Sequence, residues 1–385
     1  MIALHEPVFD ESDEAYVLRA LRDGWVSTGG PFVSMFEEAF AKYVGARYAV
    51  SVCNGTIGLH LSLEILKRRH GVSGDFYVIV PTLSFIATAN AVVHSGGIPI
   101  FIDCDEDSIN ISPSKIEETL SRDFTVMKSA LPLSRKNGKP LLAVMPAHIM
   151  GWTTDMNRVA SICRSWSLPI IEDAAEALGS FYDGKIHVGR HGAASIFSFN
   201  GNKILTTGAG GMIVTNDEEF ARKAKHLGTT AKVDTLRFIH DEVGYNYRLA
   251  NLLAGLGLSQ LEKLEQRLCQ KRAISEKYRE GFSDTSSLTV YSDRHNISNQ
   301  WLTNIVCAHY ELKEKILKTL IEGGVGARPL WAPFHRQPAY SGIEGILGEY
   351  PNADRFWERT ISLPSSAHLT DGEIFRIVGL VKSVV

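Results

Sequence analysis

The sequence has few cysteines, and they form no pattern. Five are present, and no two of them make a Cys-x-x-Cys pair: Cys53, Cys104, Cys163, Cys269 and Cys307. A disulfide framework or a structural zinc site needs cysteines that are paired or closely spaced. The sequence therefore predicts reduced thiols, as in a cytoplasmic protein, and no metal site.

Other absences exclude further classes of protein. No apolar run approaches the roughly 18–20 residues that cross a bilayer, and residues 1–11 lack the basic and apolar regions of a secretory leader. Forty basic residues against forty-three acidic ones leave a formal net charge of −3, which gives no sign of a polyanion-binding surface. The motifs His-Glu-x-x-His, Gly-x-Ser-x-Gly and Walker A are also missing. We expect a cytoplasmic protein that inserts into no membrane and binds no nucleic acid.

The chain is long enough for two domains, since it has 385 residues. Helices are predicted near 10–24 and over 32–44. Short apolar segments then alternate with helix-like stretches, and the candidate strands are 77–81, 98–103, 141–147, 168–173, 195–199 and 212–215. This alternation predicts an α/β fold with a mostly parallel sheet, whose ligand groups gather at the carboxyl ends of the strands. From about residue 252 a long helix-like stretch runs to about Tyr278, and the shorter segments beyond it predict a smaller domain.

Lys203 is the first candidate for chemistry. It lies between a short apolar segment and a turn that contains Gly208, Gly210 and Gly211, and the hydroxyl of Ser198 is close in sequence. Glycines let a backbone bend and approach a ligand closely. An amine beside groups that bind phosphate suits an enzyme that forms an imine with an aldehyde cofactor. The alternative is an ordinary surface lysine.

Further segments could supply partners for such a cofactor. Asn54-Gly55-Thr56 precedes a helix-like run, so it is either a phosphate site at a helix N-terminus or a plain N-cap. Phe85 follows a predicted strand and could stack on a flat ring, or belong to the core. Asp173 ends an apolar strand, where it could face a ring nitrogen or cap a helix. Asn246 and Arg248 could bind phosphate or belong to an ordinary loop.

In their order along the chain, these motifs resemble the sugar aminotransferases that use pyridoxal phosphate, of the DegT/DnrJ/EryC/StrS type. The resemblance runs from residue 5 to residue 366 and is carried by segments 54–56, 84–88, 172–176, 198–203, 206–208, 244–248 and 328–331. It implies the aspartate-aminotransferase fold (fold type I). That fold has a large domain, here 1–250, with a mostly parallel seven-stranded sheet flanked by helices, and a smaller α+β domain, here 251–385.

The resemblance also implies roles for individual residues at the cofactor ring. Lys203 matches the lysine that bonds to the cofactor and moves protons. Asp173 matches the carboxylate that binds the pyridinium nitrogen, so these two are the predicted catalytic residues. Phe85 matches the aromatic residue stacked on the ring, and Glu176 lies at a position near the ring hydroxyl.

The phosphate site implied by the resemblance is shared between two subunits. Gly55, Thr56 and Ser198 match its phosphate-binding positions, and Asn246 matches a ligand that reaches in from the neighbouring subunit, so a homodimer is implied. The substrate side is predicted to contain His148, Arg248, Arg328, Trp331 and His335. The alternative for His148 and His335 is that each makes a local hydrogen bond and does not contact substrate.

The subgroup that the motifs resemble most acts on UDP-linked 4-keto-6-deoxy-N-acetylhexosamines for bacterial surface glycans of the legionaminic acid or bacillosamine type. L-Glutamate is then the expected amino donor. A GDP- or dTDP-linked sugar, or amination at C3, stays open. A sugar dehydratase is disfavoured because Lys203 stands where that branch has a histidine-like position. A non-catalytic regulator that binds the cofactor or a nucleotide sugar is a further alternative.

Overall fold

The fold is built on a central sheet of seven strands in the computed structural model, which describes residues 1–127, 130–292 and 297–385. The strands are β1 (Tyr48–Val52), β2 (Tyr77–Pro81), β3 (Ile98–Ile102), β6 (Leu141–Val144), β7 (Ile171–Asp173), β10 (Ala194–Ser198) and β11 (Gly211–Thr215). Two hydrogen-bonded groups, β1-β11-β10-β7 and β6-β2-β3, meet through bridges between β6 and β7. Only β11 runs antiparallel to its neighbours among these strands. The predicted mostly parallel sheet is confirmed.

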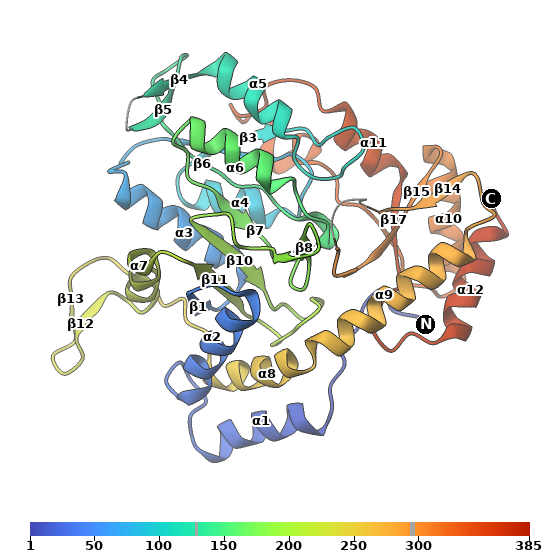
Figure 1. Ribbon diagram of the computed structural model, residues 1–385, viewed down its shortest axis with the longest axis horizontal. Helices are drawn as coiled ribbons and strands as arrows, with labels where there is room; N and C mark the ends of the chain where they lie inside the picture. Colours follow the sequence, from blue (N-terminus) through green and yellow to red (C-terminus); the bar gives the residue numbers. More distant parts are fainter. Residues whose placement is uncertain (128–129, 293–296) are drawn as a thin grey trace.

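Helices cover this sheet on both sides (Figure 1). The helices of this part of the chain are α1 (Glu11–Arg22), α2 (Pro31–Val44), α3 (Gly55–Arg69), α4 (Ala87–His94), α5 (Pro113–Asp123), α6 (Met156–Ser165), α7 (Glu218–Gly228) and α8 (Asn251–Glu262). Of these, α8 packs on α2 and α1 packs on α8, farther from the sheet. The four-residue spacing of aromatic residues predicted for α2 places Phe36 and Phe40 in the core. Both rings pack on Phe199 of the central sheet region, with centroids 5.2 and 5.3 Å away.

The long helix predicted from residue 252 to 278 is wrong, because the structure has two helices there. α8 ends at Glu262, and α9 (Leu264–Gly281) begins after Lys263. The Lys263 ammonium binds the carboxylates of Asp10 and Asp13 at the start of α1. The residue between the two helices is thus held by a tertiary contact, which a local sequence pattern does not reveal.

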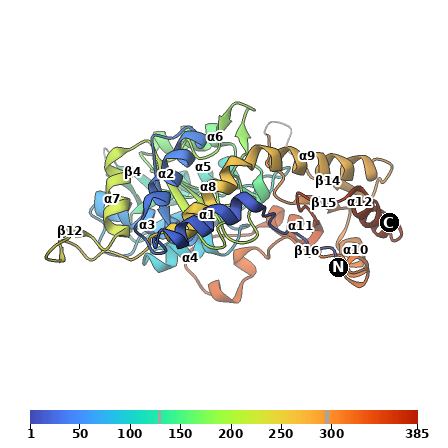
Figure 2. The ribbon, with the colours of Figure 1, turned by 90° about the horizontal axis from the view of Figure 1, so that it is seen from below.

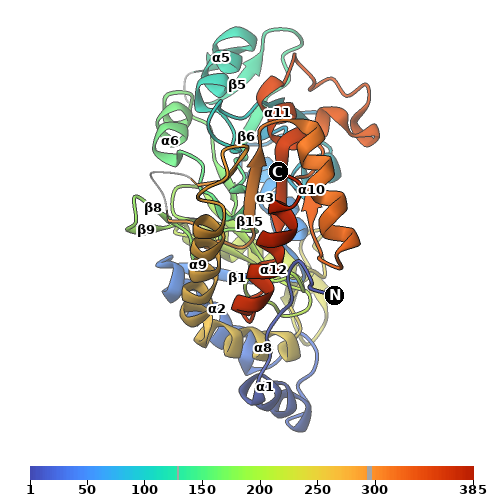
Figure 3. The same cartoon turned by 90° about the vertical axis from the view of Figure 1, so that its right-hand side faces the viewer.

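A second, antiparallel sheet lies at the other end of α9. Its strand order is β14-β15-β17-β16, with β14 (Leu288–Val290), β15 (Thr303–Cys307), β16 (Arg328–Pro329) and β17 (Thr360–Leu363). Figure 3 shows it beside α9, α10 (Tyr310–Glu322), α11 (Pro351–Arg359) and α12 (Asp371–Lys382). β14, β15, β17, α9, α10 and α12 share a separate apolar core, which also includes Ile2, whereas Ala353 and Phe356 of α11 belong to the core of the large sheet. The division into domains 1–250 and 251–385 stays a prediction.

The remaining elements are short. They are β4 (Phe124–Met127), β5 (Ala130–Ser134), β8 (Phe181–Tyr182), β9 (Ile186–His187), β12 (Lys232–Asp234), β13 (Ile239–His240), η1 (Ile149–Gly151), η2 (Phe334–Arg336) and η3 (Pro338–Tyr340). Figure 2 shows the β12–β13 hairpin projecting from the end of the molecule opposite the second sheet. No helix within the described ranges is long and apolar enough to cross a membrane.

Candidate active site

A cavity of about 280 Å³ lies at the carboxyl ends of five parallel strands. Its walls come from the segments that follow β1, β2, β6, β7 and β10, together with Trp301, Arg328 and Trp331 from the C-terminal part of the chain. Parallel strands bring their carboxyl ends to one edge, which is where such sheets bind ligands. The position predicted for the site from strand alternation is therefore the position of this cavity.

Lys203 is a cavity residue, so the alternative of an ordinary surface lysine is wrong. Its side chain is only 11% exposed, and its Nζ lies 3.1 Å from Oε1 of Glu176. On another side, Nζ lies 4.1 Å from the centroid of the Trp301 ring. The amine is held between a carboxylate and an aromatic face, both of which attract an ammonium group.

Asp173 lies at the end of β7 and is almost fully buried. Oδ2 accepts a 2.7 Å hydrogen bond from the Thr88 hydroxyl, and Oδ1 accepts one from the amide of Ala175 at 3.2 Å. Burial raises the pKa of Asp173, although these two hydrogen bonds oppose the rise. No helix begins after Asp173, so the alternative of a helix N-cap is wrong.

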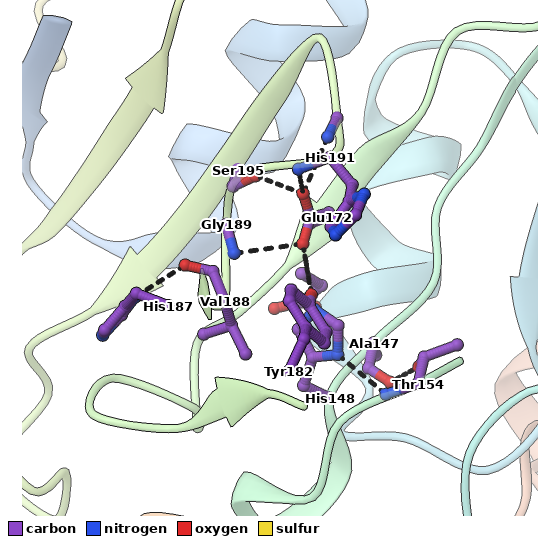
Figure 4. A network of polar contacts seen from close by, with 12 residues as sticks. Ala147, His148, Thr154, Glu172, Tyr182, His187, Val188, Gly189, His191 and Ser195 are labelled. Carbon is purple, nitrogen blue, oxygen red and sulfur yellow. Dashed lines mark hydrogen bonds and ion pairs between the residues drawn. The ribbon is translucent and has the colours of Figure 1, made fainter. Parts of the chain in front are cut away.

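Glu172, the residue before Asp173, has a very different environment on the opposite face of β7 (Figure 4). Its fully buried carboxylate accepts hydrogen bonds from the Tyr182 hydroxyl at 2.7 Å and from Nε2 of His148 at 3.2 Å. Four more donors surround it: the Ser195 hydroxyl and the amides of Gly189, His191 and Gly192. Burial alone would raise the pKa of Glu172, but these donors lower it to about 2.

The two carboxylates differ in how far they can still bind a cationic group of a ligand. Glu172 is surrounded by donors and has little need of another partner. Asp173 has two donors and faces the cavity, so it can still stabilise a cationic group of a ligand. Of this pair, Asp173 is the carboxylate that fits a protonated ring nitrogen.

Glu176 links Lys203 to the floor of the cavity. While Oε1 contacts Lys203, Oε2 accepts a 2.9 Å hydrogen bond from the amide of Met150. Met150 has a φ of 54°, which is unusual for a residue with a side chain, and this hydrogen bond helps to hold it. Burial raises the pKa of Glu176, although the nearby Lys203 opposes the rise.

The start of α3 forms another wall of the cavity. Oδ1 of Asn54 accepts a hydrogen bond from the amide of Ile57 at 2.9 Å, so the predicted N-cap is present. Gly55 permits a close approach, because an added Cβ would lie 3.1 Å from the Cβ of Ser198. A 15-residue helix that points its first amides into a cavity, beside the hydroxyls of Thr56 and Ser198, can bind a phosphate group.

Aromatic side chains line the mouth of the cavity. Phe85 is 50% exposed, so the alternative that it belongs to the core is wrong. Its ring meets the edge of Trp331, with centroids 5.8 Å apart, and Arg328 lies in the same wall. A flat heteroaromatic ring can stack on an exposed aromatic face of this kind.

Three predicted site residues do not line this cavity: Asn246, Arg248 and His335. Asn246 is exposed. The ring nitrogens of His335 are hydrogen bonded to Thr82 and Asp354. His148 does line the cavity, but Nδ1 accepts from the amide of Thr154 and Nε2 faces Glu172. The predicted roles of these residues in ligand binding stay predictions.

Two functional contacts were missed from the sequence. Thr88, whose hydroxyl donates to Asp173, falls within the segment 84–88. Its four-residue spacing from Ser84 was an available signal in the sequence, and in the structure the two hydroxyls lie 2.9 Å apart. Trp301 gave no comparable signal. Its indole Nε1 donates a 2.6 Å hydrogen bond to the carbonyl of Asn202, a residue 99 positions earlier in the chain.

Comparison with known proteins shows which family the chain belongs to. The model of the DegT/DnrJ/EryC1/StrS aminotransferase family matches residues 7–382. The chain is 35% identical to EpsN of Bacillus subtilis, described as a pyridoxal phosphate-dependent aminotransferase, over 98% of this chain and 94% of EpsN. It is 33% identical to GDP-perosamine synthase of Escherichia coli O157:H7, with 98% and 96% covered. It is 30% identical to the UDP-4-amino-4,6-dideoxy-N-acetyl-beta-L-altrosamine transaminase of Campylobacter jejuni, with 94% and 92% covered.

A solved structure agrees with these relatives. PseC of Helicobacter pylori, an aminotransferase involved in the biosynthesis of pseudoaminic acid, superposes with a TM-score of 0.88 at 27% identity, over 100% of this chain and 98% of PseC. The fold is therefore that of the fold-type-I aminotransferases, as predicted. The chain belongs to the DegT/DnrJ/EryC1/StrS family of pyridoxal-phosphate-dependent sugar aminotransferases.

Proposed function

We propose that the protein transfers the amino group of L-glutamate to C4 of a UDP-linked 4-keto-6-deoxy-N-acetylhexosamine, for the synthesis of a bacterial surface glycan. One observation carries the proposal: the Lys203 amine lies in a cavity that also contains the Asp173 carboxylate and the N-terminus of α3. The Campylobacter jejuni relative, whose name specifies a UDP-linked N-acetylated dideoxy sugar, supports the nucleotide and the sugar class.

The residues of the cavity fit pyridoxal phosphate. When bound, this cofactor supplies an aldehyde that captures amines and a ring that accepts electrons from the substrate carbon. The first turn of α3, with Gly55, Thr56 and the nearby Ser198, would bind its phosphate. Asp173 would hold the ring nitrogen protonated, and Phe85 would stack on the ring. A glycine at 55 keeps the space beside Ser198 open for the phosphate.

Lys203 performs the proton transfers in this proposal. Its amine would hold the cofactor covalently, and the amino group of glutamate would free it. The free Nζ then removes a proton from the donor carbon and, in the second half of the reaction, returns one to the sugar carbon. The face from which Nζ delivers that proton determines the configuration of the new C–N bond.

Glu176 and the substrate side complete the proposed assignment. Glu176 would contact the ring hydroxyl, with Oε2 kept in place by the Met150 amide. Arg328 and Trp331, which line the mouth, would contact the nucleotide sugar, and His148 would present its ring to the same space. Arg248 and His335 are further candidates for substrate contacts.

We further propose a homodimer in which Asn246 of one subunit contributes to the phosphate site of the other. Asn246 is exposed and does not line the cavity of its own subunit. The neighbouring segment exposes large apolar side chains, including Leu236 at 81% and Val243 at 84%. A second copy that covers this segment would bury them and bring Asn246 to a cavity.

A GDP-linked sugar is the second candidate, supported by the 33% identity to GDP-perosamine synthase over almost the whole chain. The test is to incubate the enzyme with L-glutamate and a panel of UDP-, GDP- and dTDP-linked 4-keto-6-deoxy sugars, and to identify aminated products by mass spectrometry. We expect the UDP-linked N-acetylhexosamine to react fastest. A preference for the GDP-linked sugar would replace the first candidate with the second.

Glutamate alone separates an enzyme from a regulator. With L-glutamate and no sugar, the enzyme should convert its bound cofactor to the aminated form and release 2-oxoglutarate. A regulator would leave the cofactor spectrum unchanged. In the experiment with the sugar panel, loss of a sugar hydroxyl without transfer of nitrogen would instead indicate a dehydratase.

A further inference from the structure

Trp301 contacts the reactive lysine in two ways. Its ring faces the Lys203 amine, 4.1 Å from Nζ to the ring centroid. Its indole N–H donates to the backbone carbonyl of Asn202, the residue directly before Lys203, at 2.6 Å. The indole is 3% exposed, so it cannot move away without disrupting its surroundings. One side chain therefore fixes the backbone beside Lys203 and also covers its amine.

Asn299 connects Trp301 to the segment that carries Glu176. Oδ1 of Asn299 accepts a 2.8 Å hydrogen bond from the amide of Trp301, while Nδ2 donates to the carbonyls of Glu176 and Leu178 at 2.7 and 2.9 Å. Gly151 leaves room for this amide, because an added Cβ would lie 1.9 Å from Oδ1 of Asn299. The indole and the carboxylate on either side of Lys203 thus belong to one hydrogen-bonded unit.

The charged groups around Lys203 come from several segments. Glu176 is in contact, and Asp173 is close enough to interact electrostatically. On the other side, Lys203 borders a small space whose other charged or titratable lining groups are the basic His5, Arg267 and Lys271 and the acidic Glu6. Among the described residues, the groups that contact the Lys203 amine itself are Glu176 and the Trp301 ring.

We propose that Trp301 is a positioning residue for Lys203: together with Glu176 it forms a holding site for the lysine amine whenever that amine is not bonded to the cofactor. This inference rests on the proposed function, in which Lys203 is released and recaptured in each cycle. The aromatic face and the carboxylate hold the ammonium that forms when Nζ takes a proton from the donor carbon, until it returns one to the sugar carbon, and keep the side chain from swinging towards the mouth of the cavity.

The test measures the free amine of Lys203 directly. Full-length protein without cofactor is treated with a trace of acetic anhydride at pH values from 6 to 11, and acetylation of Lys203 is quantified by mass spectrometry relative to the exposed Lys42. Wild type is compared with Trp301→Leu, which removes the aromatic face and the indole N–H, and with Trp301→Phe, which keeps a face. Trp166→Leu, at the end of α6 and outside the cavity, is the matched control.

We expect Trp301→Leu to raise the acetylation rate of Lys203 about tenfold near neutral pH and to shift the whole profile to lower pH, because a desolvated cation–π contact is lost. Trp301→Phe should give a smaller shift, and Trp166→Leu none. A pH profile that is unchanged in Trp301→Leu, or that shifts equally in Trp166→Leu, would overturn the proposal. If Trp301→Leu does not fold, the profile of Trp301→Phe decides.

Failure of the proposed function would be visible separately. Pyridoxal phosphate is added to the same wild-type sample, and covalent attachment to Lys203 is checked by borohydride reduction and peptide mass spectrometry. If pyridoxal phosphate attaches to Lys203 in wild type but the acetylation of Lys203 is unchanged in the Trp301 variants, only the proposed holding site is contradicted. Absence of attachment in wild type contradicts the proposed function, whatever the labelling shows.

Discussion

At the scale of single residues, Lys203 gives the most direct prediction. Lys203→Ala should abolish the visible absorbance band of the covalently held cofactor and reduce turnover by several orders of magnitude, because both the covalent bond and the proton transfers depend on one amine. Absorbance spectroscopy after addition of pyridoxal phosphate, combined with product detection, measures both effects. Lys42→Ala, at an exposed position, is the control. An intact band in Lys203→Ala would contradict the assignment.

Glu172 makes a prediction about stability and pH. Its pKa lies below the ordinary value of 4.5, at about 2, because six donors face a buried carboxylate. A lowered pKa stabilises the folded state fully above about pH 4.5, and this contribution is lost as the pH falls towards 2. Glu172→Gln should therefore lower the free energy of unfolding at pH 7 by on the order of 3 kcal/mol.

The gap between wild type and Glu172→Gln should narrow as the pH falls below about 4.5, since the wild type loses the contribution that the variant never had. Denaturant titrations at pH 7 and pH 3 measure the gap at each end of this window. Glu117→Gln, on an exposed face of α5, should behave like wild type at both pH values. An equal gap at pH 7 and pH 3 would show that the charge of Glu172 is not the cause.

At the scale of secondary-structure elements, two variants at the N-terminus of α3 distinguish an effect on stability from an effect on cofactor binding. Asn54→Ala removes the N-cap and should cost about 1 kcal/mol of stability. Asn54→Asp keeps a capping oxygen but adds a negative charge where the phosphate would bind. We expect its thermal unfolding to resemble wild type while its affinity for pyridoxal phosphate falls at least tenfold. Fluorescence titration with the cofactor and a thermal melt measure the two effects.

This pair of variants has opposite expected profiles, which makes the assignment of α3 testable. Asn54→Ala should lose stability but bind the cofactor better than Asn54→Asp does. If Asn54→Asp bound pyridoxal phosphate as tightly as wild type, the phosphate would have to lie elsewhere in the cavity.

The elements that could be predicted from the sequence are those whose own residues show a clear pattern. All six predicted strands have near-continuous apolar runs, and they are present at or near their predicted positions as β2, β3, β6, β7, β10 and β11. β1 was missed because it is an edge strand with only its last three residues buried. The break at Lys263 was missed because residues 259–267 contain no glycine or proline to mark it, and the ion pairs of Lys263 are with residues more than 240 positions away.

The same distinction applies to the site. Asp173 ends one predicted strand and Lys203 follows another, so the rule that ligands bind at carboxyl ends predicted that the two would lie together. Asn54 follows β1, which was not predicted, and was found instead from the signals of a helix N-terminus. Trp301 could not be found this way, because it enters from the second sheet's side of the chain and meets Lys203 only through the fold. When a side chain reaches a site from another layer of the fold, the sequence around it has no pattern that indicates the site.

At the scale of the whole molecule, the cavity of one chain lacks part of what the proposed phosphate site needs. Among the residues that line it, Lys203 and Arg328 are the only lysine or arginine side chains, and Lys203 is paired with Glu176. Asn246 lies outside, six residues after the end of β13 in the projecting β12–β13 hairpin (Figure 2), where apolar side chains such as Phe238 are exposed. This arrangement suits a site that a second subunit completes.

A mixed dimer tests this sharing directly. Lys203→Ala and Asn246→Asp are each expected to be nearly inactive as homodimers, because one lacks the amine and the other places a negative charge at the phosphate. Co-expression with two different tags yields dimers that contain one chain of each kind. If Asn246 serves the neighbouring subunit, one site of the mixed dimer combines an intact Lys203 with an intact Asn246, and about half of the wild-type activity per dimer should return. If Asn246 served its own subunit, both sites would be defective and the mixed dimer would stay inactive. A dimer of wild type with Lys203→Ala, expected at half activity in either case, calibrates the assay.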